Sequence, residues 1–448
     1  MRYCLLHLGC QMNQSDAERV RTVIEALGYE RTESEEQADL LGIVACSVRQ
    51  KAIDRVYARI RTWNSWKNKR TLLTFITGCV LPADKEAFLG LFDLLFDITE
   101  LPQLPDLIRQ YGVVTPLGAI DAIPRESLFD PSMGYWGIRP RYTSTFEAYV
   151  PIQNGCDKYC TFCAVPYTRG REVSRPSQEI LHEVAGLVER GYKSITLLGQ
   201  NVNSYGQDRV GAEISFAELL RGVGELGRDS GADFWLYFTS PHPRDMTQEA
   251  VQVIAEYPCL AKQIHLPLQS GDDKVLIRMN RNYMIDQYRE RVETIRALLP
   301  EATLFTDIIV GFSGETEEQF ENTRAAMREF QYNMAYVAMY SPRPGAASYH
   351  WPDDIPHEEK NRRLHELSEE LAKSSSAYNR RMIGGTYRVL VEGPDRKQGY
   401  LSAKTEGRIT VRFPSEDRTL IGRFVSVTIT SAAALSVQGE LAAVPVAH

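Results

Sequence analysis

Three cysteines lie close together in the stretch NGCDKYCTFC, residues 154–163. Cys156, Cys160 and Cys163 form a C-x3-C-x2-C pattern. A structural zinc site takes four ligands, but the next histidine along the chain, His182, falls in a predicted helix and no fourth ligand stands nearby. Iron–sulfur cubes are held by cysteine thiolates, and three thiolates leave one iron with an open position for a substrate or cofactor. The spacing therefore favours an open iron–sulfur cluster, with Phe162 placed to shield it from water.

A second set of three cysteines is dispersed over the first 80 residues or so. Cys10, Cys46 and Cys79 each follow a predicted strand. Because parallel strands bring their C-terminal ends to one edge of a sheet, we expect these thiols to meet in space. The alternative is that they are three buried small hydrophobic residues, as we expect for the other two cysteines, Cys4 and Cys259.

Residues 1–112 alternate strand and helix patterns. Strands are predicted over 2–9, 38–45 and 71–78, and helices over 15–28 and 49–63. Ser15 and Glu18 have capping-box spacing at the start of the first helix, and Gly28 marks its end. This βαβαβ order predicts a parallel sheet in an N-terminal α/β domain. Residues 113–145 are rich in Pro, Gly and Ser and are predicted to be a linker.

The central region repeats strand and helix six times. The predicted strands cover 147–153, 194–199, 234–239, 263–269, 304–312 and 335–341. Six such units predict a partial (β/α)6 barrel with its site at the C-terminal ends of the strands. The loop with three cysteines follows the first of these strands, so it lies at the mouth, where His242 and His265 are candidates for positioning. With a charged trailing helix over 357–382, this domain spans 146–382.

The last region reads as five short strands from residue 386 onward, which predicts a small antiparallel β-barrel over 383–446. The net charge of the chain is −7, so any nucleic-acid contact requires a local basic face. Lys and Arg slightly outnumber Asp and Glu here, and Arg388, Lys404 and Arg408 are candidates for phosphate contacts. The alternative is an ordinary solvated barrel of mixed charge.

The chain shows neither a long uncharged apolar run nor a secretory cleavage site. We therefore expect no membrane span and no secretion signal. Clustered cysteines also suit a reducing compartment, where structural disulfides are rare. These patterns predict a cytoplasmic protein.

A C-x3-C-x-aromatic-C loop after the first strand of a partial barrel resembles the radical S-adenosylmethionine (SAM) superfamily. The resemblance implies a [4Fe-4S] cluster whose open iron chelates SAM, and electron transfer that yields a 5′-deoxyadenosyl radical. Gly199, Gln200 and Asn201 in LLGQN match the position that binds the methionine amino group. Gly311 lies in TDIIVGFSGET, which resembles the fifth-strand motif near the adenine. By this resemblance Phe162 and these four residues are predicted cofactor contacts.

Within that superfamily, the chain resembles the methylthiotransferases over nearly its whole length. The motifs that carry the resemblance are GCQMNQSD, ACSVRQKA, GCDKYCTFCAVPYTRGREVSRP, LLGQNVNSYG and HLPLQSGDDKVLIRMNRNY. It implies that Cys10, Cys46 and Cys79 hold a second [4Fe-4S] cluster, which carries the sulfur to be inserted, and that two SAM molecules are used. The terminal barrel occupies the place of the RNA-binding TRAM domain. GCQMN and CSVRQKA resemble the MiaB type, which adds a methylthio group at position 2 of N(6)-dimethylallyladenosine next to the anticodon of tRNA.

The implied partners are a tRNA anticodon stem-loop with a dimethylallyl-modified adenosine, an electron donor and a sulfur donor, and the chain is expected to be a monomer. No side chain is assigned as catalytic, because the two clusters and SAM carry the chemistry. One alternative is a methylthiotransferase for threonylcarbamoyl-adenosine in tRNA or for a ribosomal-protein aspartate. Another, from a different class, is a non-catalytic iron–sulfur protein that binds RNA or transfers electrons. Ser313, where the family usually has Pro, is a departure from the pattern.

Overall fold

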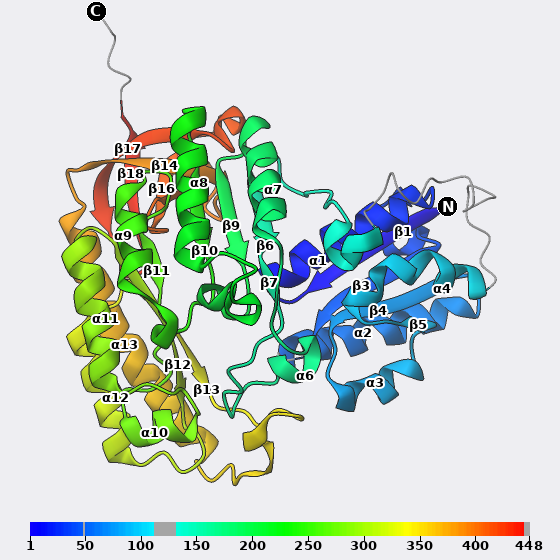
Figure 1. Cartoon of the computed structure of the whole chain (residues 1–448), viewed down its shortest axis with the longest axis horizontal. Helices are drawn as coiled ribbons and strands as arrows, with labels where there is room; N and C mark the ends of the chain where they lie inside the picture. The colour runs from blue at the N-terminus through cyan, green and yellow to red at the C-terminus, as the bar shows by residue number, and fades with distance from the viewer. Residues whose placement is uncertain (48–49, 112–130, 443–448) are drawn as a thin grey trace, which may run out of the picture.

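The computed structural model describes residues 1–47, 50–111 and 131–442, which form three parts (Figure 1). An N-terminal α/β domain lies beside an open barrel of parallel strands, and a small closed β-barrel ends the chain. Most of the predicted linker lies outside the described residues. No helix in the described ranges is long and apolar enough to cross a membrane.

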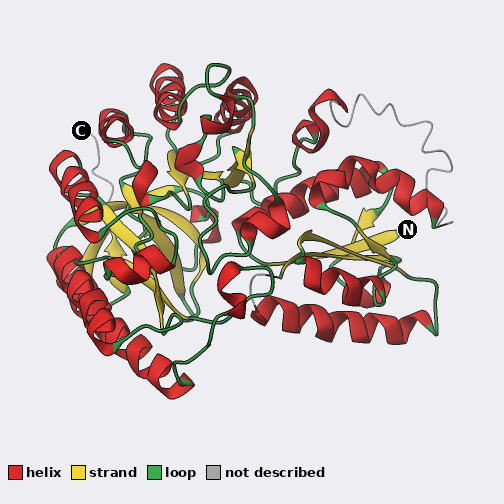
Figure 2. Ribbon diagram, turned by 60° about the horizontal axis from the view of Figure 1, so that its bottom comes forward, coloured by secondary structure: helices red, strands yellow, loops and turns green. Residues whose placement is uncertain are grey.

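The N-terminal domain is a five-stranded parallel sheet in the order β2-β1-β3-β4-β5. Strands β3 and β4 are buried along their whole length, as parallel strands covered on both faces must be, and Figure 2 shows helices on both sides of this sheet. Gly42 is required in β3, because a Cβ there would lie 2.0 Å from the ring of Phe75. The strands are β1 (Arg2–Leu8), β2 (Glu30–Arg31), β3 (Leu40–Cys46), β4 (Leu73–Cys79) and β5 (Leu94–Leu95), and the helices are α1 (Gln11–Ala26), α2 (Gln50–Lys67), α3 (Pro82–Leu89) and α4 (Leu104–Gln110).

The predicted start of the first helix is wrong. Helix α1 begins at Gln11 with Cys10 as its N-cap, and the capping box joins Cys10 to Asn13. Ser15 lies inside the helix instead, and its hydroxyl donates to the carbonyl of Tyr149 at 3.2 Å. The polar residues that resemble a cap thus face the neighbouring domain, and the earlier start places Cys10 at the helix N-terminus.

The central domain confirms the predicted partial barrel. Its six parallel strands follow chain order in two three-stranded sheets, β6-β9-β10 and β11-β12-β13, which are joined by a parallel bridge between Leu236 and Leu260. The strands are β6 (Glu147–Pro151), β9 (Ser194–Leu198), β10 (Trp235–Phe238), β11 (Gln263–His265), β12 (Thr303–Val310) and β13 (Met334–Met339). The helices are α6 (Val165–Arg169), α7 (Ser177–Glu189), α8 (Phe216–Ser230), α9 (Gln248–Glu256), α10 (Asp273–Arg278), α11 (Ile285–Leu298), α12 (Glu317–Phe330) and α13 (His357–Arg381), with a short β7–β8 pair (Gln153–Asn154 and Val173–Ser174) beside the cysteine loop.

The terminal barrel is closed in the order β14-β15-β16-β18-β17. Four of its pairings are antiparallel, as predicted, but β16 and β18 run parallel. A ring with an odd number of strands cannot alternate direction all the way round, so one parallel pair is unavoidable. The strands are β14 (Thr386–Pro394), β15 (Tyr400–Thr405), β16 (Thr410–Pro414), β17 (Phe424–Ala432) and β18 (Ser436–Leu441).

Candidate active site

The three cysteines of the first motif gather around one cavity at the mouth of the central barrel. Cys156, Cys160 and Cys163 all line this cavity, which has a volume of about 170 Å³. The loop turns at Gly155, where φ is +81° and a Cβ would lie 2.0 Å from the carbonyl oxygen of Arg171. Only glycine fits this turn without strain. The structure thus brings together three thiols that the sequence placed in one loop.

The surroundings of these thiols suit a bound iron–sulfur cluster. Burial raises the pKa of Cys156 to about 11 and that of Cys163 to about 12, so isolated thiolates are disfavoured here. The buried guanidinium of Arg281 donates from Nη1 to Cys160 Sγ at 3.3 Å. A cation placed against a buried sulfur favours the thiolate form that a cluster requires, so the donor set fits an iron–sulfur cluster.

Several predicted SAM contacts surround the same cavity. Phe162, Gln200 and Asn201 line it, and Gly199 lines the larger cavity beyond. Among the described residues, the side-chain oxygens of Gln200 and Asn201 are buried without a hydrogen-bond partner. Unpaired buried acceptors of this kind are costly, and they suit the ammonium group of a ligand.

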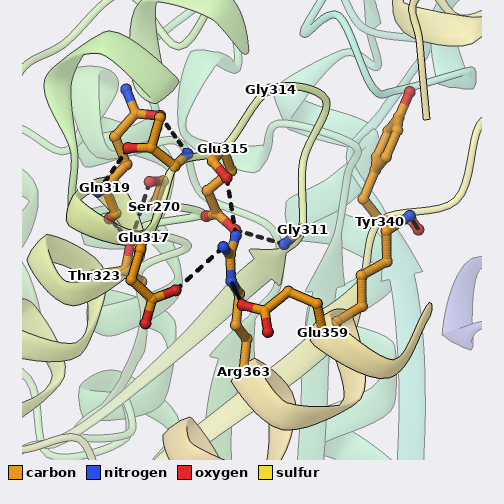
Figure 3. Close-up of polar contacts among 12 residues, drawn as sticks. Ser270, Gly311, Gly314, Glu315, Glu317, Gln319, Thr323, Tyr340, Glu359 and Arg363 are labelled. Atoms are coloured by element: carbon orange, nitrogen blue, oxygen red, sulfur yellow. Dashed lines mark hydrogen bonds and ion pairs between the residues drawn. The ribbon is translucent and has the colours of Figure 1, made fainter. Parts of the chain in front are cut away.

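Gly311, the remaining predicted contact, lines neither cavity. Its backbone N–H donates to Glu315 Oε2 at 2.6 Å, and Arg363 Nη1 donates to the same oxygen at 2.8 Å (Figure 3). A Cβ at Gly311 would lie 2.4 Å from Cγ of Lys360. These contacts join the end of β12 to α13, so the structure gives Gly311 a role in packing, and its contact with SAM stays a prediction.

The second set of cysteines meets at the C-terminal edge of the N-terminal sheet. Cys46 and Cys79 end adjacent strands and pair in register, and a side-chain hydrogen bond joins them. Asn13 connects the third thiol, because Cys10 Sγ donates to its Oδ1 at 3.4 Å and its Nδ2 donates to Cys79 Sγ at 3.7 Å. The three strand ends share one edge, and Asn13 lies between Cys10 Sγ and Cys79 Sγ. That the three thiols hold one cluster stays a prediction.

Arg169 connects the two cysteine sets. It ends α6, just after the Cys156 loop, and its Nε donates to Cys79 Sγ at 2.9 Å across the domain boundary. Its Nη2 forms an ion pair with Asp16 of α1 at 2.5 Å, and both side chains are buried. The hydrogen bond with Cys46 and burial raise the pKa of Cys79, whereas the charge of Arg169 acts in the opposite direction. No pattern in the sequence indicates this role, because the contact joins segments far apart in the chain.

The two cysteine sites lie at adjoining cavities. A cavity of about 760 Å³ is lined by Cys10 at the N-terminal domain and by side chains that point into the central barrel. It shares Val165, Gln200, Ser240 and Asp307 with the smaller cavity around Cys156. The larger cavity, which we call the chamber and which Cys10 borders, therefore adjoins the smaller cavity that holds the Cys156 loop.

The two candidate histidines differ in their surroundings. His265 lines the large chamber, and its Nε2 lies 3.0 Å from Asp307 Oδ2. His242 lines the smaller cavity, where burial and the nearby charge of Arg281 lower its pKa to about 2. His242 is therefore neutral at ordinary pH, and positioning roles for both residues stay predictions.

Of the three candidate basic residues, only Arg408 reaches the chamber. Arg388 stacks on the ring of Phe424 and pairs with Asp233. Lys404 donates from Nζ to Thr410 Oγ1 at 2.7 Å. The contact of these three residues with RNA phosphates stays a prediction.

Glu172, which follows the cysteine loop, predicts a pH dependence of stability. Burial raises its pKa from 4.5 to about 7, although Ser204 Oγ donates to its Oε1 at 2.5 Å. Between these values the folded chain holds a proton that the unfolded chain has released, so stability falls as pH rises through this window, by up to about 3 kcal/mol. Glu172→Gln should therefore flatten the dependence of the urea midpoint on pH between 4.5 and about 7. An unchanged slope in the variant would contradict this assignment.

Comparison with known proteins agrees with the geometry. Residues 150–327 match the model of the radical SAM superfamily, residues 2–96 match uncharacterized protein family UPF0004, and residues 380–442 match the TRAM domain. Among solved structures, the radical S-adenosylmethionine methyltransferase TsrM from Kitasatospora setae shares the fold, with a TM-score of 0.57 at 14% identity over 78% of this chain and 75% of that chain. An open barrel with three thiols after its first strand, together with these matches, defines a radical SAM protein with a TRAM domain.

Curated relatives identify the family within the radical SAM proteins. The tRNA-2-methylthio-N(6)-dimethylallyladenosine synthase of Chromobacterium violaceum is 38% identical over 439 residues, which are 96% of each chain. The synthase of the same name from Actinobacillus succinogenes is 36% identical over 449 residues, covering 97% of this chain and 90% of the relative. The chain belongs to the family of tRNA-2-methylthio-N(6)-dimethylallyladenosine synthases.

Proposed function

We propose that this protein is an enzyme that inserts a methylthio group at position 2 of N(6)-dimethylallyladenosine next to the anticodon of tRNA. The observation that carries the proposal is a pair of adjoining cavities: the chamber borders Cys10, and the smaller cavity, which shares four lining residues with the chamber, borders the Cys156 loop. The names of the curated relatives and the TRAM match support tRNA as the substrate. In this proposal the chain has three domains with separate roles: residues 1–112 bind the second cluster, residues 146–382 form the radical SAM core, and residues 383–446 bind RNA.

The cofactors of this proposal are two [4Fe-4S] clusters and SAM. Cys156, Cys160 and Cys163 would hold one cluster, and Cys10, Cys46 and Cys79 the other. When bound, these groups supply a 5′-deoxyadenosyl radical for removal of hydrogen from the adenine ring, and the sulfur that replaces it. Each set offers three thiols for a cube that usually takes four, so a bound cluster would keep one iron free for a ligand.

In this proposal the side chains of the protein bind and orient the cofactors and the substrate. Gln200 and Asn201 present buried oxygens to the SAM ammonium group, while Phe162 covers the cavity wall. Arg281 and Arg169 each hold a sulfur of one set by a hydrogen bond. The chamber, with a volume of about 760 Å³, has room for a base that is flipped out of a single-stranded loop. The protein would act in the cytoplasm as a monomer, with an external electron donor and an external sulfur donor.

The test is anaerobic reconstitution with iron, sulfide, SAM, a reductant and tRNA carrying dimethylallyl-adenosine. We expect about eight iron atoms per chain, formation of 5′-deoxyadenosine, and 2-methylthio product in the digested tRNA by mass spectrometry. Parallel reactions contain tRNA with threonylcarbamoyl-adenosine or ribosomal protein. If product forms only with one of these alternative substrates, that molecule is the substrate of the enzyme. If the fully loaded protein forms no 5′-deoxyadenosine, the enzyme proposal is overturned in favour of a binding or redox protein.

A further inference from the structure

The terminal barrel inserts one turn into the central barrel. This turn joins β15 to β16 and contains Glu406, Gly407 and Arg408. Tyr237 of β10 donates from its hydroxyl to the carbonyl of Glu406 at 3.1 Å, and Thr303, the first residue of β12, donates to the carbonyl of Gly407 at 2.7 Å. The turn therefore closes the central barrel near the start of its strands, opposite the mouth that holds the cysteine loop.

The approach of this turn is close. A Cβ on Gly407 would lie 2.6 Å from Cγ2 of Thr303. Arg408 has a left-handed backbone with φ of +58°, a conformation that is uncommon for a residue with a side chain. Strain of this kind persists where the surrounding structure fixes it, and it is common at functional sites. Here the backbone directs Arg408 toward the chamber.

The guanidinium of Arg408 is held in place inside the chamber. It lies over the ring of Tyr237 at 4.0 Å, and its Nη2 donates to Thr196 Oγ1 at 3.2 Å. A smaller cavity of about 120 Å³ continues from the chamber toward the terminal barrel, with Phe305, Tyr336 and Arg408 on the boundary of both. Tyr336 is 54% exposed although it lies on an inward position of β13. The chamber thus holds a fixed planar cation and an uncovered aromatic ring.

The charges near Arg408 are balanced. Glu147 and Glu392 both act electrostatically on Tyr237, the residue on whose ring Arg408 lies, and Glu392 also interacts directly with Arg408. Lys404 lines the adjoining cavity. Two carboxylates at this position oppose the binding of a phosphate. An uncharged nucleobase suits the site better, because it accepts hydrogen bonds from a guanidinium and stacks on an aromatic ring.

We propose that Arg408 is a substrate-binding residue that contacts the target base inside the reaction chamber, so that the terminal barrel forms part of the active site. This proposal rests on the proposed function. A purine whose C2 faces the cysteine sites at the mouth directs its N7 side away from them. The N7 acceptor then meets the guanidinium of Arg408, and the ring of Tyr336 supports the base. A phosphate contact would instead make Arg408 part of the outer RNA-binding surface.

The experiment uses the reconstituted full-length enzyme with Arg408→Gln and Arg408→Lys. At saturating tRNA, both variants should still cleave SAM, but 2-methylthio product per 5′-deoxyadenosine should fall about 10- to 100-fold, in line with loss of a charged hydrogen bond. The salt dependence of tRNA binding should stay unchanged, because no phosphate contact is lost. Full activity of Arg408→Lys would show that a point charge suffices and would overturn the proposal.

Two controls separate binding from structure. Arg418→Gln makes the same change on an exposed surface of the same barrel and should leave the ratio of the two products unchanged. Thr303→Val removes the hydrogen bond to the carbonyl of Gly407. It therefore measures how far loosening of the turn alone lowers the ratio of 2-methylthio product to 5′-deoxyadenosine, which we call the coupling. If Thr303→Val uncouples as strongly as Arg408→Gln, or if Arg408→Gln lowers the salt slope by about one with normal coupling, Arg408 does not bind the base. Wild-type product formation tests the proposed function separately.

Discussion

Cys10→Ala is expected to abolish methylthio transfer while leaving SAM cleavage in place. Cys10 lines the chamber at the N-terminal domain and is one of the three thiols proposed to hold the second cluster. Loss of a ligand should cost more than the roughly 10- to 100-fold typical of outer hydrogen-bond partners. Iron content should fall from about eight to about four atoms per chain, and 5′-deoxyadenosine should still form at the Cys156 site.

The matched controls are Cys4→Ala and Cys259→Ala, which make the same chemical change elsewhere. Cys4 is buried in the core beside α2, and Cys259 packs against the core of the central barrel. Both variants should keep full iron content and product formation, with at most a modest loss of stability. If Cys10→Ala retained eight iron atoms and made product, or if it lost SAM cleavage as well, the assignment of two separate sites would be wrong.

The cysteines were predictable from sequence because their positions follow from local patterns. One set lies in a single loop, and the other follows three strands whose C-terminal ends share an edge. Asn13 was missed because the helix start was placed at Ser15, and only the true start at Gln11 puts Asn13 between the sulfurs. A capping pattern is a local signal. The Ser15 side chain does not cap the helix, because its hydroxyl instead donates to the carbonyl of Tyr149 in the neighbouring domain.

The arginines of the site were not predictable in the same way. Arg169, Arg281 and Arg408 reach their partners across long sequence separations, so periodicity and spacing carry no information about them. Arg388, Lys404 and Arg408 looked alike as basic residues of one barrel. Only the docking of the turn at Gly407 distinguishes Arg408, because that turn enters the central barrel.

Replacement of Arg169 by Gln should strongly destabilise the contact between the N-terminal and central domains. The pair with Asp16 is buried, and Asp16 also accepts from the hydroxyl of Tyr135 at 2.6 Å. Removing the cation leaves the buried carboxylate without its ion-pair partner and with only the longer-range attraction of Arg19. Breaking a buried pair in this way typically costs about 3–5 kcal/mol. We expect a lower urea midpoint and, in the reconstituted enzyme, SAM cleavage without product, since the two cysteine sites lose their fixed alignment.

A double-mutant cycle isolates the ion pair from general loss of packing. Arg169→Gln combined with Asp16→Asn should be less destabilised than the sum of the single variants, with a coupling of about 1–3 kcal/mol. Arg171→Gln with Asp157→Asn provides the matched cycle, because Arg171 lies two residues after Arg169 and its side chain is 79% exposed. An exposed pair should give less than about 1 kcal/mol. Equal coupling in the two cycles would mean that the Arg169–Asp16 contact does not join the domains, and the alignment of the two cysteine sites would then depend on other contacts, such as that of Ser15 with Tyr149.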